Sequence, residues 1–254
     1  MRKKLLLAVG LLLAGLALAL SGTEVMQKVA AQPRPTTMHG KMEMRLVDKH
    51  GRELTRVLET WSKQEGDVEK KLIKFLAPAD VKGTSFLVIS RNGQDEMKLY
   101  LPALKRVRRI AGGQKKGSFM GSDFSYDDIS NLGKIEVDDY ENKLLREEEL
   151  NGAKTYVVEA RPKAGVDSSY DKQILWVRAD DFVPVQIEFY QKGKLVKVMT
   201  LDQVQKFAGG KYLMPTHMVM ENVKSKHKTE LTMSDLELDV DIPDSVFSER
   251  FMKR

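Results

Sequence analysis

The strongest constraint on this sequence is a succession of short segments in which apolar and polar residues alternate. Met42, Met44 and Leu46, for example, alternate with charged residues, which is the period-two pattern of a half-buried strand. Tight turns separate such segments, and Asn151-Gly152 gives the strongest hairpin signal. We therefore predict a mainly β protein of about eleven antiparallel strands in meander order. A single sheet of that many strands curls and so acquires a concave face.

The N-terminal residues 1–19 have the pattern of a cleaved signal peptide. A basic start, residues 2–4, precedes the uncharged run Leu5–Leu20, and a small-x-small cleavage site ends at Ala19. An uncleaved membrane anchor is the competing interpretation, but the run is shorter than the roughly 20 residues that a spanning helix needs. We therefore expect an exported protein whose residues 20–254 form one domain.

The composition narrows the classes of function. The chain has no cysteine, which excludes disulfides, thiolate metal sites, cysteine nucleophiles and a lipid attached to a lipobox thiol. The net charge is +6, and removal of the three basic residues of the signal leaves +6 − 3 = +3. A charge this small, without a module of interleaved aromatic and basic residues, does not indicate nucleic-acid binding. It is compatible with peripheral contact with anionic lipid head groups.

The residues predicted to face the concave side are large and apolar, and methionine is frequent among them. Methionine is flexible and polarisable, so it suits a surface that adapts to varied apolar ligands, although it also fills gaps in ordinary cores. We predict that this face forms a hydrophobic cavity. Its predicted lining residues are Met42, Met44, Leu46, Trp61, Phe75, Met97, Leu99, Trp176, Ile187, Phe189, Met199, Met218 and Met220.

One connection, residues 110–131, is far longer and richer in glycine and aromatic residues than a hairpin requires. Loops of this length are usually functional or disordered, and disordered segments are poor in aromatic residues. We therefore predict a mobile flap that packs apolar side chains over the cavity. Its predicted gate residues are Phe119, Met120, Phe124 and Tyr126.

Two charged groups lie in or beside this connection. Asp123, Asp127 and Asp128 offer three interpretations: a cation site, caps of a short helix that starts near Ser125, or ion pairs with nearby arginines. The spacing does not match a calcium-binding loop, so we predict no metal site. The arginines Arg106, Arg108 and Arg109 either protect a strand edge or form a rim that meets phosphate or carboxylate head groups.

The chain resembles a known family in two adjacent stretches. Residues 101–110 read LPALKRVRRI and residues 117–128 read GSFMGSDFSYDD, and both resemble the signature of the outer-membrane lipoprotein-sorting proteins, which are related to the periplasmic carriers LolA and LolB. The Trp-Val-Arg strand at 176–178, the strand after Pro184 and the closing IPDSVF at 242–247 are also similar. The resemblance extends over nearly the whole mature chain.

The resemblance implies an incomplete β-barrel, with short helices and a loop as a lid over a hydrophobic cavity. It also implies a periplasmic protein that carries lipid or lipoprotein acyl chains, with an inner-membrane lipid transporter as a candidate partner. No esterase, zinc-protease or phosphate-loop motif is present, so we predict neither an enzyme nor a cofactor. A sensor or adaptor that binds a protein partner with the same fold is the alternative, and a hydrolase that uses the flap carboxylates is a third.

Overall fold

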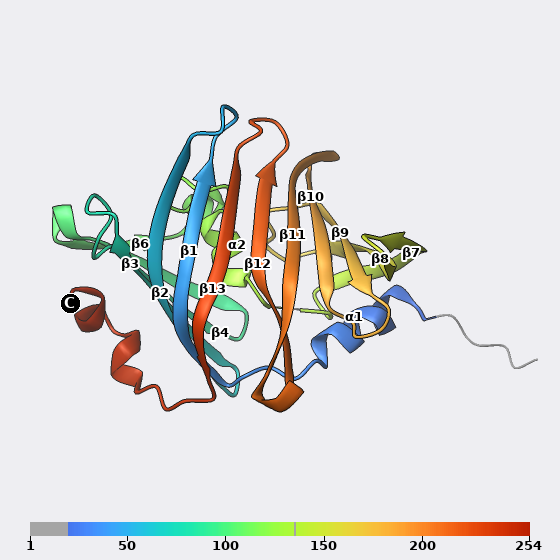
Figure 1. The fold of residues 1–254 in the computed structure, drawn as a ribbon, viewed down its shortest axis with the longest axis horizontal. Helices are drawn as coiled ribbons and strands as arrows, with labels where there is room; N and C mark the ends of the chain where they lie inside the picture. Colours follow the sequence, from blue (N-terminus) through green and yellow to red (C-terminus); the bar gives the residue numbers. More distant parts are fainter. Residues whose placement is uncertain (1–19, 135) are drawn as a thin grey trace, which may run out of the picture.

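Thirteen antiparallel strands form one curved sheet (Figure 1). The computed structural model describes residues 20–134 and 136–254, so the predicted signal peptide lies outside the described residues. In chain order the strands are β1 (Thr37–Val47), β2 (Glu53–Glu65), β3 (Val68–Ala77), β4 (Ser85–Arg91), β5 (Gln94–Leu101), β6 (Arg106–Ile110), β7 (Tyr140–Leu150), β8 (Ala153–Pro162), β9 (Lys172–Arg178), β10 (Pro184–Gln191), β11 (Lys194–Phe207), β12 (Tyr212–Asn222) and β13 (Lys228–Leu238).

The mainly β, single-sheet architecture predicted from the sequence is confirmed, and the number of strands exceeds the predicted eleven. The order across the sheet is β6-β5-β4-β3-β2-β1-β13-β12-β11-β10-β9-β8-β7. Each strand therefore pairs with its neighbours in sequence, with two exceptions: β6 and β7 do not pair with each other, and β1 pairs with β13. The shortest strand, β6, has the sequence RVRRI and lacks a clear apolar alternation, because it lies at an edge and has only one partner.

The pairing of β1 with β13 places β6 and β7 at opposite edges of an unclosed sheet. These two strands are consecutive in the chain, so the connection from Ile110 to Tyr140 has to travel from one edge to the other. It does so across the concave face, and its helix α2 (Tyr126–Asn131) lies behind β1 and β13 in Figure 1. We refer to residues 111–134 as the crossing segment.

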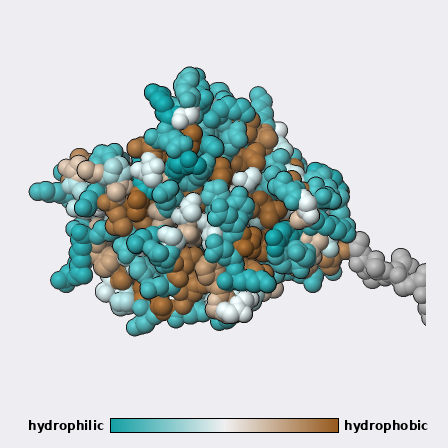
Figure 2. Space-filling view, in the orientation of Figure 1, coloured by the Kyte–Doolittle hydropathy of each residue, from teal (hydrophilic) through white to brown (hydrophobic). Residues whose placement is uncertain are grey.

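Period-two alternation assigns the side chains to two faces of the sheet. Met42 and Met44 of β1 lie opposite Met233 and Leu231 of β13 and point to the concave side. The intervening residue Glu43 points to the outer side, which Figure 2 shows as mostly hydrophilic with scattered apolar areas. The main core of the protein is therefore the concave face and the segments that fill it.

The helix α1 (Gly22–Ala30) covers one end of the concave face. Ser21 is its N-cap: the Ser21 Oγ accepts from the Glu24 N–H at 3.2 Å, and the Glu24 Oε2 accepts from the Ser21 N–H at 2.7 Å. The apolar side of α1 packs its valines and Met26 on Val158 and Leu175 of β8 and β9. The remaining short helices are η1 (Pro102–Leu104), η2 (Gly112–Lys116), η3 (Ala208–Gly210), η4 (Asp244–Phe247) and α3 (Glu249–Met252).

The C-terminal segment covers part of the outer face. Phe247 of η4 and Met252 of α3 pack on Leu72 and Leu87, which alternate with the concave-side residues of β3 and β4. This second apolar layer gives strands β2 to β4 a buried surface on both sides. Among residues 20–134 and 136–254, no helix is long and apolar enough to cross a membrane.

The close approach of α1 to β7 yields a testable prediction. A Cβ atom at Gly22 would lie 2.4 Å from the Leu144 backbone nitrogen. We expect Gly22→Ala to lower the free energy of unfolding by about 1–3 kcal/mol because backbone atoms cannot move aside as a flexible side chain can. Urea denaturation measures the change. Gly113→Ala is the matched control, since no atom lies within 4 Å of a Cβ at that glycine. An increase in stability for Gly22→Ala, as helix propensity alone would produce, would contradict the close contact.

His39 lies on the outer side at the junction of the two halves of the sheet. Its Nε2 lies 2.9 Å from Glu59 of β2 and its Nδ1 lies 2.9 Å from Glu237 of β13. Its ring also stacks on Trp61, with centroids 5.2 Å apart. Burial lowers the pKa of His39, but the hydrogen bonds to the two glutamates outweigh it and raise the pKa above the ordinary 6.5.

Because the pKa of His39 is raised in the folded state, its contribution to stability is complete below pH 6.5 and is lost as pH rises through the folded-state pKa. We therefore expect the melting temperature to fall modestly over that interval, and to fall less in a His39→Gln variant. Melting curves at a series of pH values measure this, with His50→Gln in the exposed β1–β2 turn as control. Equal pH dependence in the wild type and the His39→Gln variant would contradict the role of the two carboxylates.

Candidate functional site

The concave face carries the main apolar cluster of the protein. Most of the predicted cavity residues are buried together in it, and Ile187 is partly buried against it. These residues are Met42, Met44, Leu46, Phe75, Met97, Leu99, Phe189, Met199, Met218 and Met220. Methionines from β1, β5, β11 and β12 therefore line one continuous surface.

The two predicted cavity tryptophans do not lie on this surface. Trp61 is 9% exposed and packs on the outer side against Phe251, with centroids 5.6 Å apart. Trp176 follows the concave-side residue Leu175, so it points the other way, and its indole N–H donates to Glu148. The prediction for both residues was wrong because each strand has a polar or branched residue at the inward position while its bulkiest residue points outward.

The crossing segment fills the concave face with its own side chains. Phe119 and Phe124, predicted gate residues, are 0% exposed in the main cluster. Met120 and Tyr126, the other two, are partly buried against it. All four predicted gate residues therefore lie together against the predicted cavity, and the two phenylalanines occupy its interior.

Aromatic contacts join the crossing segment to the sheet. The Phe119 ring lies 5.3 Å from that of Phe86 and 5.9 Å from that of Phe75. Tyr126 lies 5.3 Å from Phe86 and meets Phe119 edge to face at 5.5 Å. Such pairs stabilise by roughly 0.5–1.5 kcal/mol each beyond the burial of their area.

A tight turn presents the two phenylalanines to the interior. The Phe119 N–H donates to the Phe124 carbonyl at 2.7 Å, and the Ser122 N–H donates to the Phe119 carbonyl at 3.0 Å. The turn between them includes Met120 and Gly121, both with positive φ. Gly121 adopts this conformation without steric cost, which explains one glycine of this segment.

The three aspartates of the crossing segment hold it in place. Asp128 completes a capping box with Ser125, the N-cap of α2, as one of the three interpretations of the sequence predicted. Its carboxylate also accepts from the Tyr170 hydroxyl and from Lys197 of β11, both at 2.8 Å. Burial, together with the Asp128 charge, raises the pKa of Tyr170, so this hydroxyl stays a donor. Asp127 accepts from the Ser169 hydroxyl at 2.7 Å.

Further anchors lie on both sides of α2. Asp123 accepts from the hydroxyl of Thr229, in β13, at 2.8 Å and lies 2.5 Å from the Nδ1 of His227, the residue before that strand. At the other end, Lys71 of β3 donates to three carbonyls at the C-terminus of α2 at 3.1–3.3 Å. Burial lowers the pKa of Lys71. The aspartates thus pair with histidine, serine, tyrosine and lysine, and not with the three rim arginines.

Arg106, Arg108 and Arg109 are exposed on the edge strand β6. The charge of Arg108 acts on Tyr126 of the crossing segment, where it opposes the rise in pKa that burial causes. Strand β6 is labelled at the left of Figure 1. The position of the three arginines on β6 agrees both with protection of a sheet edge and with a rim beside the concave face.

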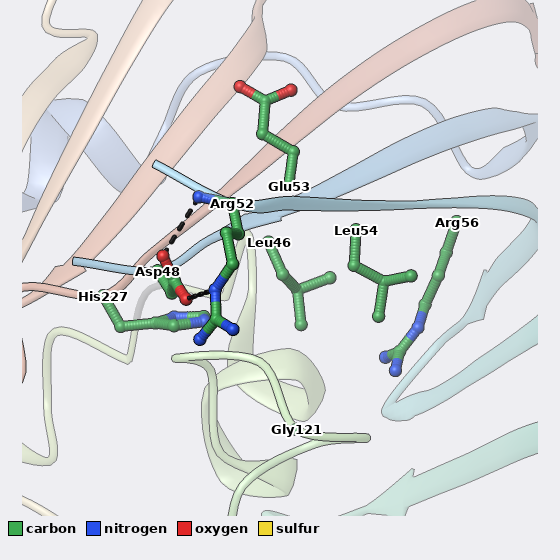
Figure 3. Close-up of a pocket in the computed structure, with 8 residues that line it drawn as sticks. All are labelled: Leu46, Asp48, Arg52, Glu53, Leu54, Arg56, Gly121 and His227. Carbon is green, nitrogen blue, oxygen red and sulfur yellow. Dashed lines mark hydrogen bonds and ion pairs between the residues drawn. The ribbon is translucent and has the colours of Figure 1, made fainter. Parts of the chain in front are cut away.

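An open groove of about 460 Å³ lies where the crossing segment meets the β1–β2 hairpin (Figure 3). Leu46 and Leu54 form its apolar wall, and Gly121 of the crossing segment lies opposite. Arg56 points from β2 toward that segment and donates to the Met120 carbonyl. Among the described residues, no group of three histidines, aspartates or glutamates is arranged to hold a metal ion.

Several residues of this site had no recognisable signal in the sequence. Lys71, Tyr170 and Lys197 lie in ordinary strand or loop patterns, and only the fold brings them to the crossing segment. Arg56 had a weak signal, since it occupies an inward position between Leu54 and Leu58.

Together, these features define the class of protein: an open antiparallel half-barrel whose concave apolar face is filled by its own crossing segment. Two solved structures are similar to this fold over nearly their whole length. A putative outer-membrane lipoprotein-sorting protein domain from Vibrio parahaemolyticus is 35% identical, with a TM-score of 0.84 over 92% of this chain and 98% of the other. A DUF1329 family protein from Desulfovibrio piger is 34% identical, with a TM-score of 0.85 over 91% and 97% of the two chains.

The chain therefore belongs to the outer-membrane lipoprotein-sorting protein family, as the sequence motifs predicted. A family model described as "-like: Uncharacterized protein" matches residues 67–254. A LolA superfamily protein from Nitrosomonas europaea has the same fold, with 22% identity and a TM-score of 0.71 over 92% of this chain and all of the other. No curated protein matches the chain.

The ion pair between Asp128 and Lys197 yields a prediction about the crossing segment. We expect Lys197→Met to leave a mostly buried carboxylate without its cation, and so to loosen this segment selectively. Amide hydrogen exchange over residues 117–131 should accelerate by at least roughly tenfold, while exchange in β3 and β4 stays unchanged.

Lys194→Met on the same strand is the matched control, because Lys194 is exposed at the start of β11. Uniform acceleration across the whole sheet would mean that the crossing segment is an inseparable part of the core and would contradict the prediction.

Proposed function

We propose that this protein is a periplasmic carrier that binds lipid or lipoprotein acyl chains in the concave face of its half-barrel. The crossing segment acts as the gate, and the carrier transfers its cargo between membranes or to an inner-membrane lipid transporter. Residues 1–19 direct its export and residues 20–254 form the carrier domain. The observation that carries this proposal is that Phe119 and Phe124, which belong to a connection and not to the sheet, fill the apolar concave face.

The apolar side chains of the crossing segment and an acyl chain would gain similar free energies from burial in the concave face. Complete burial of a large apolar side chain is worth about 1.5–3 kcal/mol, so Phe119, Phe124 and Ile129 together contribute on the order of 5–9 kcal/mol. A sixteen-carbon acyl chain gains on the order of 10 kcal/mol gross at about 0.8 kcal/mol per buried methylene. The exchange of side chains for ligand is therefore close to balanced, which is what loading and release both require.

The contacts that hold the gate support displacement as a unit. Besides its buried apolar side chains, the crossing segment is attached to the sheet by side-chain hydrogen bonds and ion pairs, among them those of Asp123, Asp128 and Lys71. Its backbone does not add a strand to the sheet, and its one isolated bridge, between Ser118 and Ser125, is internal. Opening it therefore breaks no strand pairing.

The cavity that we propose is lined by the ten clustered residues and Ile187, without the two tryptophans. We propose that Arg106, Arg108 and Arg109 form the rim that meets head groups or an anionic membrane surface, because β6 is exposed beside the gate. We also propose that the protein is not an enzyme, because the polar groups of the gate are engaged in holding it.

A disulfide lock tests the gate directly. Because the chain has no cysteine, the double variant Asp123→Cys/Thr229→Cys adds one defined cross-link between the crossing segment and β13. We expect the oxidised variant to bind no lipid and the reduced variant to bind it. Native mass spectrometry of residues 20–254, purified after export and without detergent, measures bound lipid and identifies it.

Each single cysteine variant, treated with the same oxidant, is the control and should keep its lipid. Equal lipid loading in the oxidised and reduced double variants would contradict gating by this segment. An unliganded mass for every form, unchanged by incubation with membrane lipids, would contradict the carrier and favour an adaptor that binds a protein partner.

A further inference from the structure

Arg56 differs from every other buried charge in the described part of the chain. It is 7% exposed, which is less than any other lysine or arginine there. The buried acids are compensated: Glu230 pairs with Arg45 and Lys228, and Asp123 contacts His227. Within the described residues, Arg56 forms no ion pair. Its Nε is also the one buried side-chain nitrogen or oxygen atom there that has no hydrogen-bond partner. A buried cation without a counter-charge is costly unless an anion joins it.

The position of Arg56 joins the apolar interior to the open groove. In the β1–β2 register it lies opposite Met44, which is fully buried on the concave face, and its guanidinium lies 5.9 Å from the Phe75 ring. On its other side it lines the groove beside Leu46 and Leu54 (Figure 3). A molecule with an apolar chain in the interior would therefore place its polar end at Arg56.

The other charges of the groove are already engaged with one another. Arg52 pairs with Asp48 at 2.6 Å, and Glu53 pairs with Arg45 at 3.0 Å. Asp80 is exposed and acts on Arg56 only through its charge, without forming an ion pair. Arg56 is thus the charged residue of this groove that has no ion-pair partner, and its guanidinium points toward the crossing segment.

We propose that Arg56 binds the anionic group, a carboxylate or phosphate, of an amphiphile whose hydrocarbon chain takes the place of Phe119 and Phe124. This inference deepens the proposed carrier function and rests on it. Arginine suits the role because its planar guanidinium donates to two oxygens of a carboxylate or phosphate at once.

The same contact links recognition of the anion to opening of the gate. Arg56 donates to the Met120 carbonyl in the filled state. A charged oxygen is a stronger acceptor than a neutral carbonyl, so an anion at Arg56 competes with Met120 for the guanidinium. Loading of the head group then removes one of the contacts that hold the crossing segment on the sheet.

Chain-matched probes test the assignment. The probes are hexadecanoic acid, hexadecyl phosphate and hexadecanol, titrated into delipidated protein at a pH where the acid is ionised. We expect the wild type to bind the two anions at least about tenfold more tightly than the alcohol. In Arg56→Gln the three affinities should become similar through loss of anion binding, and Arg56→Lys should keep part of the preference. Arg250→Gln, exposed in α3, should behave like the wild type.

The outcomes separate this inference from the carrier function. Equal affinity of the wild type for acid and alcohol would overturn the role of Arg56 and leave the carrier standing, even if Arg56→Gln did not fold. Unchanged anion preference in a folded Arg56→Gln variant would overturn it as well. Binding of inorganic phosphate as tight as that of hexadecyl phosphate would show that a free anion is the ligand and overturn the amphiphile. Failure of all three probes to bind would contradict the carrier function itself.

Discussion

The pairing of β1 with β13 is the interaction on which the rest of the structure depends. It joins two meanders, β1 to β6 and β7 to β13, into one sheet. Because this pairing occupies the centre of the sheet, the edges are β6 and β7, which follow one another in the chain. The connection between them then has to cross the concave face, where it meets the apolar side chains of both halves. The length and apolar content of residues 111–134 are consequences of this topology.

The crossing segment covers the apolar concave face with side chains of the protein itself. Phe119 and Phe124 bury hydrocarbon in the place that we propose for an acyl chain, while the charged contacts of Asp123, Asp128 and Lys71 hold the backbone above it. In the proposed carrier, the apolar contacts set how much free energy a cargo has to supply, and the polar contacts set where the segment is attached. A surface of methionines suits this exchange because their side chains can repack around either occupant.

The candidate site could be predicted from the sequence where a residue's direction follows from local alternation. Met42, Met44, Met218 and Met220 belong to regular strands, and their inward direction was predicted correctly. Trp61 was placed on the wrong side because β2 directs Arg56 and Thr60 inward, so its apolar pattern is misleading. The anchors of the crossing segment were not predictable, because they come from strands far away in the sequence.

The sequence by itself determined the strand meander, the tight turns, the apolar inward positions, the exceptional connection and the family. These features depend on local periodicity, turn chemistry and short motifs, which are all contained within neighbouring residues. The tertiary structure alone decided that β6 and β7 form the two edges, that Phe119 and Phe124 fill the concave face, and that Arg56 is buried without a counter-charge. The physical reason is that strand pairing between distant segments and the balance of buried charge are properties of the whole assembled sheet.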